Sequence, residues 1–515
     1  MAPQLARSFV VWVAIFLSVH VTAQANLSTL PETLQMISAN IWPDIENIGH
    51  AIYAHPETAL EEYFAASTIT GYFEDNPSLF NVTEQAYGFE TSLKLTFENV
   101  PAGYGGKVPT LAFLLEYDAL PEIKHACGHN LIATVGLAAA TMTREALLYY
   151  DIPARIVVYG CFDEEDTAGK RLLLNAGAFG DEYAVFMMAH PTATSAVQPM
   201  QARIDAKVEL SGSTHFEVVG KMYQELVIIH DLAAKLPGHA TTASSIEEIG
   251  MYAINVIQTK IELGVTNATL EEIDDVVATV RNDDDAFVNQ TYTLAEDENG
   301  VAITFTGPGG HASEGTESPL SLSVQTYRAL EASNSTHSYY LPSNTSHTQL
   351  GITVSIRTRY TIELEEVRSY FDNAVQGLPD SVTYDIPYPA LEVHEELGQY
   401  FIDLMATPEF GDNSWAFSSI APAATDASFV QNPTINETSY ELLSTSRVVF
   451  HPNFGICDTS TITNCPFNHE PEFNDIADLD YAYVQTERVA RALAHTAVEL
   501  ANDKDFFDSV RSIVD

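Results

Sequence analysis

The stretch TLAFLLEYDALP, residues 110–121, decides the fold class, because an unbroken apolar run ends there in acidic residues. Strands buried on both faces of a parallel sheet show such continuous runs, whereas half-exposed strands alternate. Two further runs have the same form, ARIVVYGCFDEED at residues 154–166 and YAVFMMAHP at residues 183–191. Helical patterns at residues 131–149 and 170–176 separate the three runs. This alternation predicts an α/β fold with a mainly parallel central sheet and helices on both faces.

The alternation of apolar strand runs with helical patterns ends at about residue 200. Amphipathic helical stretches at residues 216–236 and 245–263 precede a strand, a Gly-rich turn and a helix at residues 301–332, and an alternating strand follows. Such a module suits a smaller α+β domain inserted into the first. We therefore predict a signal peptide over residues 1–25, a first domain over residues 26–200 and 390–515, an otherwise unassigned helical insertion over residues 201–299, and a smaller domain over residues 300–389.

The composition bounds the classes of partner. The 515 residues include 70 acidic side chains against 23 Lys and Arg, for a formal net charge of −47. A surface with this excess of negative charge repels phosphate backbones and anionic lipid heads. We therefore expect neither a nucleic acid nor a membrane surface as a partner. The length favours two domains or one elaborated large one.

The N-terminus has the three parts of a secretory signal peptide. Arg7 supplies a positive charge, the apolar run at residues 9–19 is too short to span a bilayer, and AQA at residues 23–25 is a small-x-small cleavage site. No later apolar run predicts a membrane span. Acceptor sequences for N-glycosylation occur at Asn26, Asn81, Asn267, Asn289, Asn334, Asn344 and Asn436. The sequence therefore predicts a secreted, N-glycosylated protein.

The four cysteines are too few for a disulfide scaffold. Cys457 and Cys465 lie in a loop-like stretch and could form one bridge in an oxidising compartment. Cys127 and Cys161 could form a second bridge, and Cys127 would then be a structural residue. The alternative is that Cys127 binds a metal, and both interpretations stay open at this point.

Polar side chains that can bind metals or move protons follow the carboxyl ends of the predicted strands: Asp118, Cys127, His129, Glu164, Glu165 and His190. Ligands bind at that edge of an open α/β sheet, so distant segments would deliver these residues to one rim. Imidazole, thiolate and carboxylate ligands suit zinc, manganese and cobalt. In the pair Glu164–Glu165, one carboxylate can bind metal while the other acts as a base. His469, in NHEPEF, is a further candidate.

The ordered motifs EYDALPEIKHACGHNLIA, EED, MMAHP, GPGGHAS, ATDASFV and NHEPEF resemble those of a co-catalytic metallopeptidase family, peptidase family M20, which includes aminoacylases, carboxypeptidases and amino-acid amidohydrolases. The resemblance extends from about residue 33 to the end of the chain. Asn130 of the CGHN motif is typical of the aminoacylase-1-like branch, whereas hippurate and auxin-conjugate hydrolases tend to carry Asp there.

The resemblance implies that the domain over residues 26–200 and 390–515 is the catalytic metal-binding domain and that the domain over residues 300–389 is a lid or dimerisation domain. It implies a pair of divalent ions, zinc or else manganese or cobalt, bound by Cys127, His129, Glu165, His190 and His469. It also implies that Glu164 is the general base and acid and that Asp118 orients the site. His311 of the lid would help to polarise the scissile carbonyl, in many relatives across a homodimer. Arg357, in the lid strand, would contact a substrate carboxylate.

The sequence departs from the family pattern at two places. Phe162 and Asp163 precede the two glutamates where Pro-Ala is usual, so Asp163 adds a third acid beside the pair. The spacing from His190 to His311 is much longer than in relatives. Either helices have been inserted, or the lid histidine is His215 in VELSGSTHF. The Gly-Gly-His-Ala-Ser context favours His311.

The predicted function is hydrolysis of an amide bond in a short peptide or an N-acyl amino acid. Two cations lower the pKa of water from 15.7 toward about 7, and Glu164 would pass the proton to the leaving nitrogen. One alternative is a catalytically inactive secreted binding protein that keeps the fold. A disulfide-bonded α/β hydrolase without metal is another, although no Gly-x-Ser-x-Gly elbow supports a serine nucleophile.

Overall fold

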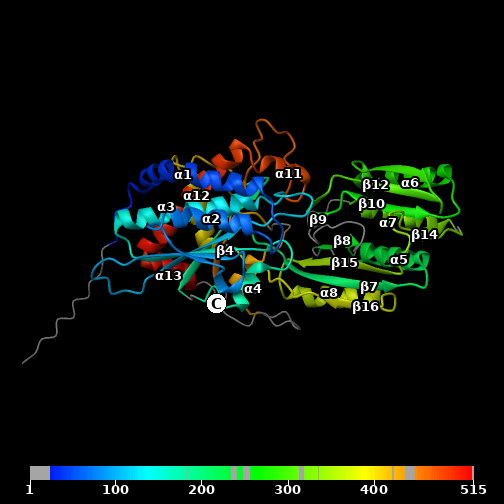
Figure 1. The fold of residues 1–515 in the computed structure, drawn as a ribbon, viewed down its shortest axis with the longest axis horizontal. Coiled ribbons are helices and arrows are strands. Elements are labelled where there is room, and N and C mark those ends of the chain that lie inside the picture. The colour runs from blue at the N-terminus through cyan, green and yellow to red at the C-terminus, as the bar shows by residue number, and fades with distance from the viewer. Residues whose placement is uncertain are drawn as a thin grey trace, which may run out of the picture.

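The computed structural model describes residues 24–180, 183–233, 240–246, 256–311, 318–333, 336–419, 423–434 and 447–512. These residues form two lobes, which lie side by side in Figure 1. The first lobe contains the N-terminal and C-terminal parts of the described chain, and the second contains the middle part. Most of the predicted signal peptide and the acceptor residues Asn334 and Asn436 lie outside the described residues.

The central sheet of the first lobe has six strands in the order β1-β2-β4-β3-β5-β17. The strands β4, β3, β5 and β17 run parallel, and β1 and β2 form an antiparallel edge. The bounds are β1 Asn81–Glu84, β2 Leu93–Asn99, β3 Thr110–Glu116, β4 Ala154–Cys161, β5 Ala184–Met187 and β17 Val448–Phe450. A short parallel pair, β6 His190–Thr192 with β18 Asn453–Gly455, lies beyond β5.

The predicted apolar runs form the central strands because both faces of the sheet are covered. Every residue of β3 is buried, and β4 is buried from Ile156 to Cys161. Helix α3, His129–Tyr150, packs on β3 and β4, and α1, Leu30–Ala54, and α12, Asp480–Asn502, pack against α3. Figure 1 shows these three helices on one side of the sheet and α4 and α13 on the other.

The remaining helices of the first lobe are short. They are α2 Tyr63–Asp75, η1 Ala86–Gly88, α4 Gly169–Asn175, α9 Glu395–Met405, α10 Ala427–Gln431, α11 Pro471–Ile476 and α13 Lys504–Ser512. Among the described helices, α3 is long and apolar enough to cross a membrane, but 83% of its apolar window is buried inside the lobe. Helices in the core of a folded domain also have this length and composition.

The second lobe has two four-stranded sheets that share one hydrophobic core. One sheet has the order β16-β7-β15-β8 and the other β11-β12-β10-β14, while β13 pairs with β9. The strands are β7 Ala202–Ser211, β8 Ala240–Ile246, β9 Val256–Ile257, β10 Lys260–Val265, β11 Thr291–Glu296, β12 Val301–Thr306, β13 Gly310–His311, β14 Tyr339–Tyr340, β15 Gln349–Thr358 and β16 Ser381–Tyr384. The helices are α5 His215–Ala233, α6 Leu270–Asp283, η2 Asp285–Phe287, α7 Pro319–Ala332 and α8 Glu363–Val375.

The chain crosses between the lobes twice, and the two crossings pair with each other. Met200 and Leu391 exchange backbone hydrogen bonds of 2.9 and 3.2 Å. Arg203 and Tyr388 exchange two more, of 3.1 and 2.7 Å. The second lobe is therefore an insertion whose entry and exit strands are held together where they leave the first lobe.

The expectation of a helical insertion over residues 201–299 is wrong for the described residues. α5 is a helix as predicted, but the described part of residues 245–263 contains strands rather than a helix. Ile261, Leu263 and Val265 recur at every second position of β10 and are fully buried. The period of two therefore decides the structure here, because one face of β10 covers the core of the second lobe. The predicted fold class, an α/β domain with a smaller α+β lobe, is confirmed.

Candidate metal centre

Five residues predicted to bind metal meet at the carboxyl edge of the central sheet, and we call them the metal cluster: Cys127, His129, Glu165, His190 and His469. Cys127 and His129 lie at the start of α3, and Glu165 follows β4. His190 follows β5, and His469 precedes α11. The sheet therefore brings together side chains from four separate segments, as the positions of the strand ends predict.

The ligand atoms of the metal cluster face one another. The Sγ of Cys127 lies 3.5 Å from Nε2 of His190. Nε2 of His469 lies 3.3 Å from Oε1 of Glu165, and Nε2 of His129 lies 3.6 Å from the same oxygen. Donor atoms within 4.8 Å of one another form two sets of three, Cys127 with His129 and His190, and Cys127 with Glu165 and His469. The two sets share the thiol, so they are adjacent.

Asp118 connects two segments of the metal cluster. Its Oδ1 accepts a hydrogen bond from Nδ1 of His129 at 3.0 Å, and its Oδ2 accepts one from the backbone N–H of Glu165 at 3.0 Å. Because a carboxylate only accepts, His129 carries a proton on Nδ1 and turns Nε2 toward the cluster. In the same way, Nδ1 of His190 donates to the carbonyl of Pro191 at 2.9 Å, which leaves Nε2 to face Cys127.

The turn that carries Cys127 and His129 depends on Gly128. This glycine has φ +78°, in the left-handed region that glycine occupies without a steric penalty. A Cβ at Gly128 would lie 2.5 Å from Cγ of Pro191, so the turn packs directly on the segment after His190. The other histidine of the motif, His125, turns away and bonds the carbonyl of Ile52 through Nε2 at 3.2 Å.

The loop that carries His469 is attached to the same turn. The N–H of His469 donates to the carbonyl of Ala126 at 2.8 Å. The side-chain amide of Asn468 donates to the carbonyls of Cys127 and Pro191, at 3.3 and 3.0 Å. His469 itself has φ +70°, a strained conformation for a residue with a side chain. These bonds hold the imidazole in place against that strain.

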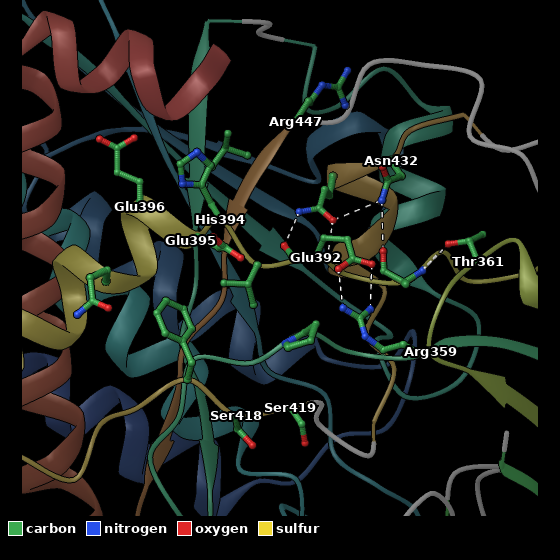
Figure 2. Close-up of a pocket in the computed structure, with 17 residues that line it drawn as sticks. Arg359, Thr361, Glu392, His394, Glu395, Glu396, Ser418, Ser419, Asn432 and Arg447 are labelled. Atoms are coloured by element: carbon green, nitrogen blue, oxygen red, sulfur yellow. Dashed lines mark hydrogen bonds and ion pairs between the residues drawn. The ribbon is translucent and has the colours of Figure 1, made fainter. Parts of the chain in front are cut away.

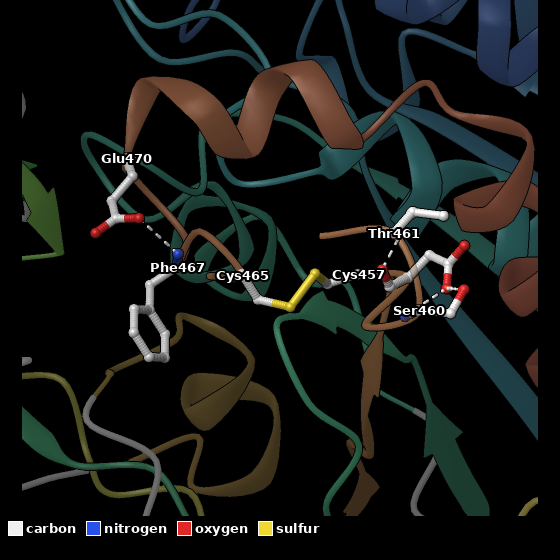
Figure 3. The surroundings of a disulfide bond; sticks show 7 residues. Cys457, Ser460, Thr461, Cys465, Phe467 and Glu470 are labelled. Atoms are coloured by element: carbon white, nitrogen blue, oxygen red, sulfur yellow. Dashed lines mark hydrogen bonds between the residues drawn. A yellow bond between two sulfur atoms is a disulfide. The ribbon is translucent and has the colours of Figure 1, made fainter. Parts of the chain in front are cut away.

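A disulfide joins Cys457 and Cys465 just before the loop that carries His469, as Figure 3 shows. This is the bridge that the sequence allowed. Cys127 and Cys161 are both free and buried, so the alternative bridge between them is wrong. The Cys127 thiol is therefore available to bind a metal.

The site gathers more acidic side chains than basic ones: Glu116, Asp118, Glu164, Glu165 and Asp426 are buried or nearly so. In the described part of the chain, Lys170 pairs with two of them, Glu116 and Asp426. Nε2 of His129 and Oε2 of Glu116 are buried 3.6 Å apart, and neither has a hydrogen-bond partner among the described residues. A buried excess of negative charge is costly without a counter-charge. The donor set and its charge therefore fit divalent cations.

The protonation equilibria of the site agree with cation binding. Burial lowers the pKa of His190 to about 3, so its imidazole is neutral and can act as a ligand. Burial, followed by the carboxylate of Glu165, raises the pKa of the Cys127 thiol well above its ordinary value. The thiolate that a metal requires would need a nearby cation to form there.

Glu164 differs from its neighbour Glu165 in exposure. Its side chain is 11% exposed, against 3% for Glu165, and its Oε2 lies 4.0 Å from Nε2 of His129. Burial, and then the carboxylates of Glu116 and Glu165, raise its pKa well above the ordinary value. A carboxylate in this position takes up a proton readily.

Two side chains at the strand ends were not part of the predicted ligand set. Glu116 is the last residue of β3, and its carboxylate forms a further set of three donors with His129 and Glu164 within 4.8 Å. His451 directly follows β17, is buried, and lies 5.9 Å from His190 between ring centroids. The apolar run VVF before His451 signals a strand end, but a strand of three residues is too short to recognise by periodicity.

Arg357 of β15 is 1% exposed, and Nη1 and Nη2 have no hydrogen-bond partner among the described residues. Its neighbour across the strands, Arg203 of β7, is paired with Asp205 through Nε at 2.7 Å and Nη2 at 2.5 Å. Burial, and then the charge of Arg203, lower the pKa of Arg357 to about 9, so the guanidinium is still charged at neutral pH. Arg357 is thus a buried cation with unused donors.

The two candidates for the lid histidine differ in position. The backbone of His311, in β13, pairs with that of Val256, in β9, and the side chain of His311 lies outside what the structure describes. A Cβ on Gly309 would lie 3.9 Å from Pro471, which places the Gly-rich turn beside the loop of His469. By contrast, both ring nitrogens of His215 are bonded to backbone, at 2.8 Å to the carbonyl of His347 and at 3.0 Å to the N–H of Leu341.

The third acid, Asp163, has hydrogen-bond partners of its own and is in none of the sets of donors near the metal cluster. It has φ +53°, and its carboxylate accepts hydrogen bonds from the backbone and hydroxyl of Thr167. Its N–H donates to Oε1 of Glu62 at 2.9 Å. These bonds fix the loop that carries Glu164 and Glu165.

A separate hollow of about 1230 Å³ lies between the end of β15 and α9, and Figure 2 shows its lining. Arg359 and Glu392 form a bidentate ion pair on its wall, with both distances 2.9 Å. None of the metal-cluster residues lines this hollow.

Replacement of Asp118 by Asn should weaken zinc binding by about 10- to 100-fold, because an amide has one acceptor oxygen and cannot accept from both His129 and the backbone of Glu165. Competition with a chromogenic chelator measures this affinity. Asp75→Asn, at an exposed position, is the matched control. Equal zinc affinity of Asp118→Asn and the wild type would contradict the orienting role.

No family model matches the chain. Xaa-Arg dipeptidase of Mus musculus is 40% identical over 169 residues, which cover 32% of this chain and 39% of that protein. The Homo sapiens Xaa-Arg dipeptidase is 41% identical over 173 residues, with the same coverage. A p-aminobenzoyl-glutamate hydrolase component from Escherichia coli is 30% identical over 168 residues, 28% of this chain and 32% of that protein. The matches thus span less than two fifths of these relatives.

Solved structures extend the likeness to the whole fold. A putative aminohydrolase from Staphylococcus aureus has a TM-score of 0.51 at 14% identity, covering 91% of this chain and 99% of its own. An aminobenzoyl-glutamate utilization protein from Klebsiella pneumoniae has a TM-score of 0.50 at 14% identity, covering 90% and 98%. The expected aminoacylase-1-like branch stays a prediction. About a third of the sequence is therefore similar to Xaa-Arg dipeptidases and to a p-aminobenzoyl-glutamate hydrolase, and the fold is similar to that of the two solved structures.

Proposed function

We propose that the protein is a secreted, metal-dependent hydrolase that cleaves an amide bond in a short peptide or an N-acyl amino acid. The observation that carries the proposal is the buried metal cluster beside a separate carboxylate, Glu164, that remains partly exposed. The names of the relatives, a dipeptidase and an aminobenzoyl-glutamate hydrolase, support an amide as the substrate bond.

Two divalent ions would be held by the metal cluster. Cys with His and Glu suits zinc first, and manganese or cobalt are the alternatives. Cations at such a site supply Lewis acidity, which lowers the pKa of water and polarises a carbonyl. The residues around them fix the ligands: Asp118 orients His129, and the carbonyl of Pro191 orients His190.

Glu164 moves the proton. Its Oε2 faces the metal cluster without belonging to either set of donors that contains Cys127. It would accept a proton from the attacking water at this oxygen and deliver it to the leaving nitrogen. Burial and the adjacent carboxylates raise the pKa of Glu164 above its ordinary value, which makes its carboxylate a stronger base.

Arg357 binds an anionic group of the substrate. It is buried and charged, and its Nη1 and Nη2 donors lack partners in the described part of the chain. His311, on β13 beside the loop of His469, would polarise the scissile carbonyl. The homodimer that the family resemblance implies stays a prediction, and light scattering of the purified protein tests it.

Secretion and N-glycosylation are supported by the positions of the acceptor asparagines. Asn26, Asn81, Asn267 and Asn289 are exposed in the structure, and Asn344 is partly buried. Glycans on the four exposed asparagines would extend into solvent and would not disturb the packing of the protein.

Replacement of Glu164 by Gln should lower kcat by about 10²- to 10⁴-fold while metal content stays unchanged, because the amide cannot carry the proton. The assay uses zinc-loaded protein and a panel of dipeptides and N-acyl amino acids. Glu61→Gln, at an exposed position, is the control. Wild-type kcat in Glu164→Gln would contradict the role, and no turnover by the wild type would favour the inactive binding protein.

Replacement of Arg357 by Met should raise KM by about 10- to 100-fold for substrates with a free carboxylate, since a hydrogen bond to a charged group contributes about 1.5–3 kcal/mol. The same substrates as carboxamides should show little change. Arg359→Met removes a surface arginine paired with Glu392 and serves as the control. An equal effect on both substrate classes would contradict the assignment.

Expression in eukaryotic cells should deliver the protein to the medium with N-linked glycans. Digestion with peptide N-glycosidase should then reduce its mass, and Asn81→Gln should remove one of the increments. Retention inside the cells without a mass change on digestion would contradict secretion.

A further inference from the structure

Lys170, the second residue of α4, is fully buried behind the metal cluster, and its side chain is paired with two carboxylates. Its Nζ contacts Oε1 of Glu116 and lies 2.5 Å from Oδ1 of Asp426. An ammonium buried this deeply persists only where its charge and its donors are matched. The two carboxylates provide that match.

The contacts of Asp426 lead from Lys170 to Glu164. The backbone N–H of Lys170 donates to Oδ2 of Asp426 at 2.8 Å, while Nζ holds Oδ1. Both carboxylate oxygens of Asp426 are therefore fixed by one residue. The backbone N–H of Asp426 in turn donates to Oε1 of Glu164 at 3.4 Å.

The second partner of Lys170, Glu116, also lies close to Glu164, because the two carboxylates and His129 have donor atoms within 4.8 Å of one another. Glu116 offers Oε1 to Lys170, and its Oε2 lies 3.6 Å from Nε2 of His129. The start of α4 is also tied to the loop of the two glutamates, because the N–H of Gly169 donates to the carbonyl of Asp163 at 2.7 Å. Lys170 thus contacts two residues that each lie next to Glu164, namely Glu116 and Asp426.

We propose that Lys170 is a positioning residue, which holds Asp426 so that the Asp426 backbone amide fixes the Glu164 carboxylate in its working orientation. This inference rests on the proposed function for its kinetic consequence, but the geometry that it asserts is independent of turnover. A lysine that served only to neutralise buried charge would be replaceable by any change that restores the charge balance. A lysine that positions Asp426 could not be replaced in this way, because the contact with Asp426 would still be lost.

The double variant Lys170→Met, Asp426→Asn separates these two roles. It removes one positive and one negative charge together, so the net charge of the buried cluster is unchanged, and it keeps the backbone amide at position 426. Glu116 loses its ammonium partner but keeps its contact with Nε2 of His129. A crystal structure of the variant should show that this amide has moved away from Oε1 of Glu164. With zinc content unchanged, kcat should fall by about 10- to 100-fold, and KM should change by less than about threefold, because misplacement of a catalytic group by about 1 Å has an effect of this order.

The matched control is Lys207→Met, Asp385→Asn, which removes a Lys–Asp pair that is half exposed on the second lobe, with Nζ 3.2 Å from Oδ2. It should leave kcat unchanged. A kcat of the Lys170→Met, Asp426→Asn variant within twofold of the wild type, or an unchanged contact between the Asp426 amide and Glu164, would overturn the proposal. If the wild type itself shows no amide hydrolysis, the proposed function fails, and the crystal structure of the variant still decides the positioning role.

Discussion

The site depends on the two hydrogen bonds of one buried carboxylate. Asp118 accepts from the imidazole of His129 at one oxygen and from the backbone of Glu165 at the other. The first bond fixes the nitrogen that His129 presents, and the second fixes the loop after β4 on the end of β3. The parallel strands bring these segments close together, and the hydrogen bonds of Asp118 then fix the relative orientation of His129 and Glu165.

Electrostatics explain why the arrangement needs a cation. The chain carries a net charge of −47, and the buried side chains around the metal cluster are also mainly acidic. Lys170 offsets part of this charge from the rear of the site, through Glu116 and Asp426. Divalent ions held by the metal cluster would offset more of this charge.

The parts of the fold that follow from local pattern could be predicted from the sequence. The strand ends after residues 116, 161 and 187 are visible as apolar runs that stop at acidic or imidazole side chains. Common membership of one sheet edge then brings these side chains together. The ligand roles came from the family resemblance, and the structure tests only the proximity on which they depend.

What the sequence did not predict depends on contacts distant in the chain. The strands of residues 256–265 look helical in isolation, because their pairing with β12 and β13 lies outside any local window. Lys170 looks like an ordinary helix lysine until Glu116 and Asp426 close around it. The periodicity of a sequence cannot predict the pairing of Lys170 with Asp426, because the two residues are 256 positions apart.

Anomalous diffraction at the zinc absorption edge, from crystals of protein purified without chelator, tests the central claim most directly. The account predicts two peaks inside the metal cluster, one of them about 2.3 Å from Sγ of Cys127, the usual zinc–thiolate distance. Absence of any peak within coordination distance of Cys127, His129 and Glu165 in zinc-soaked crystals would contradict it.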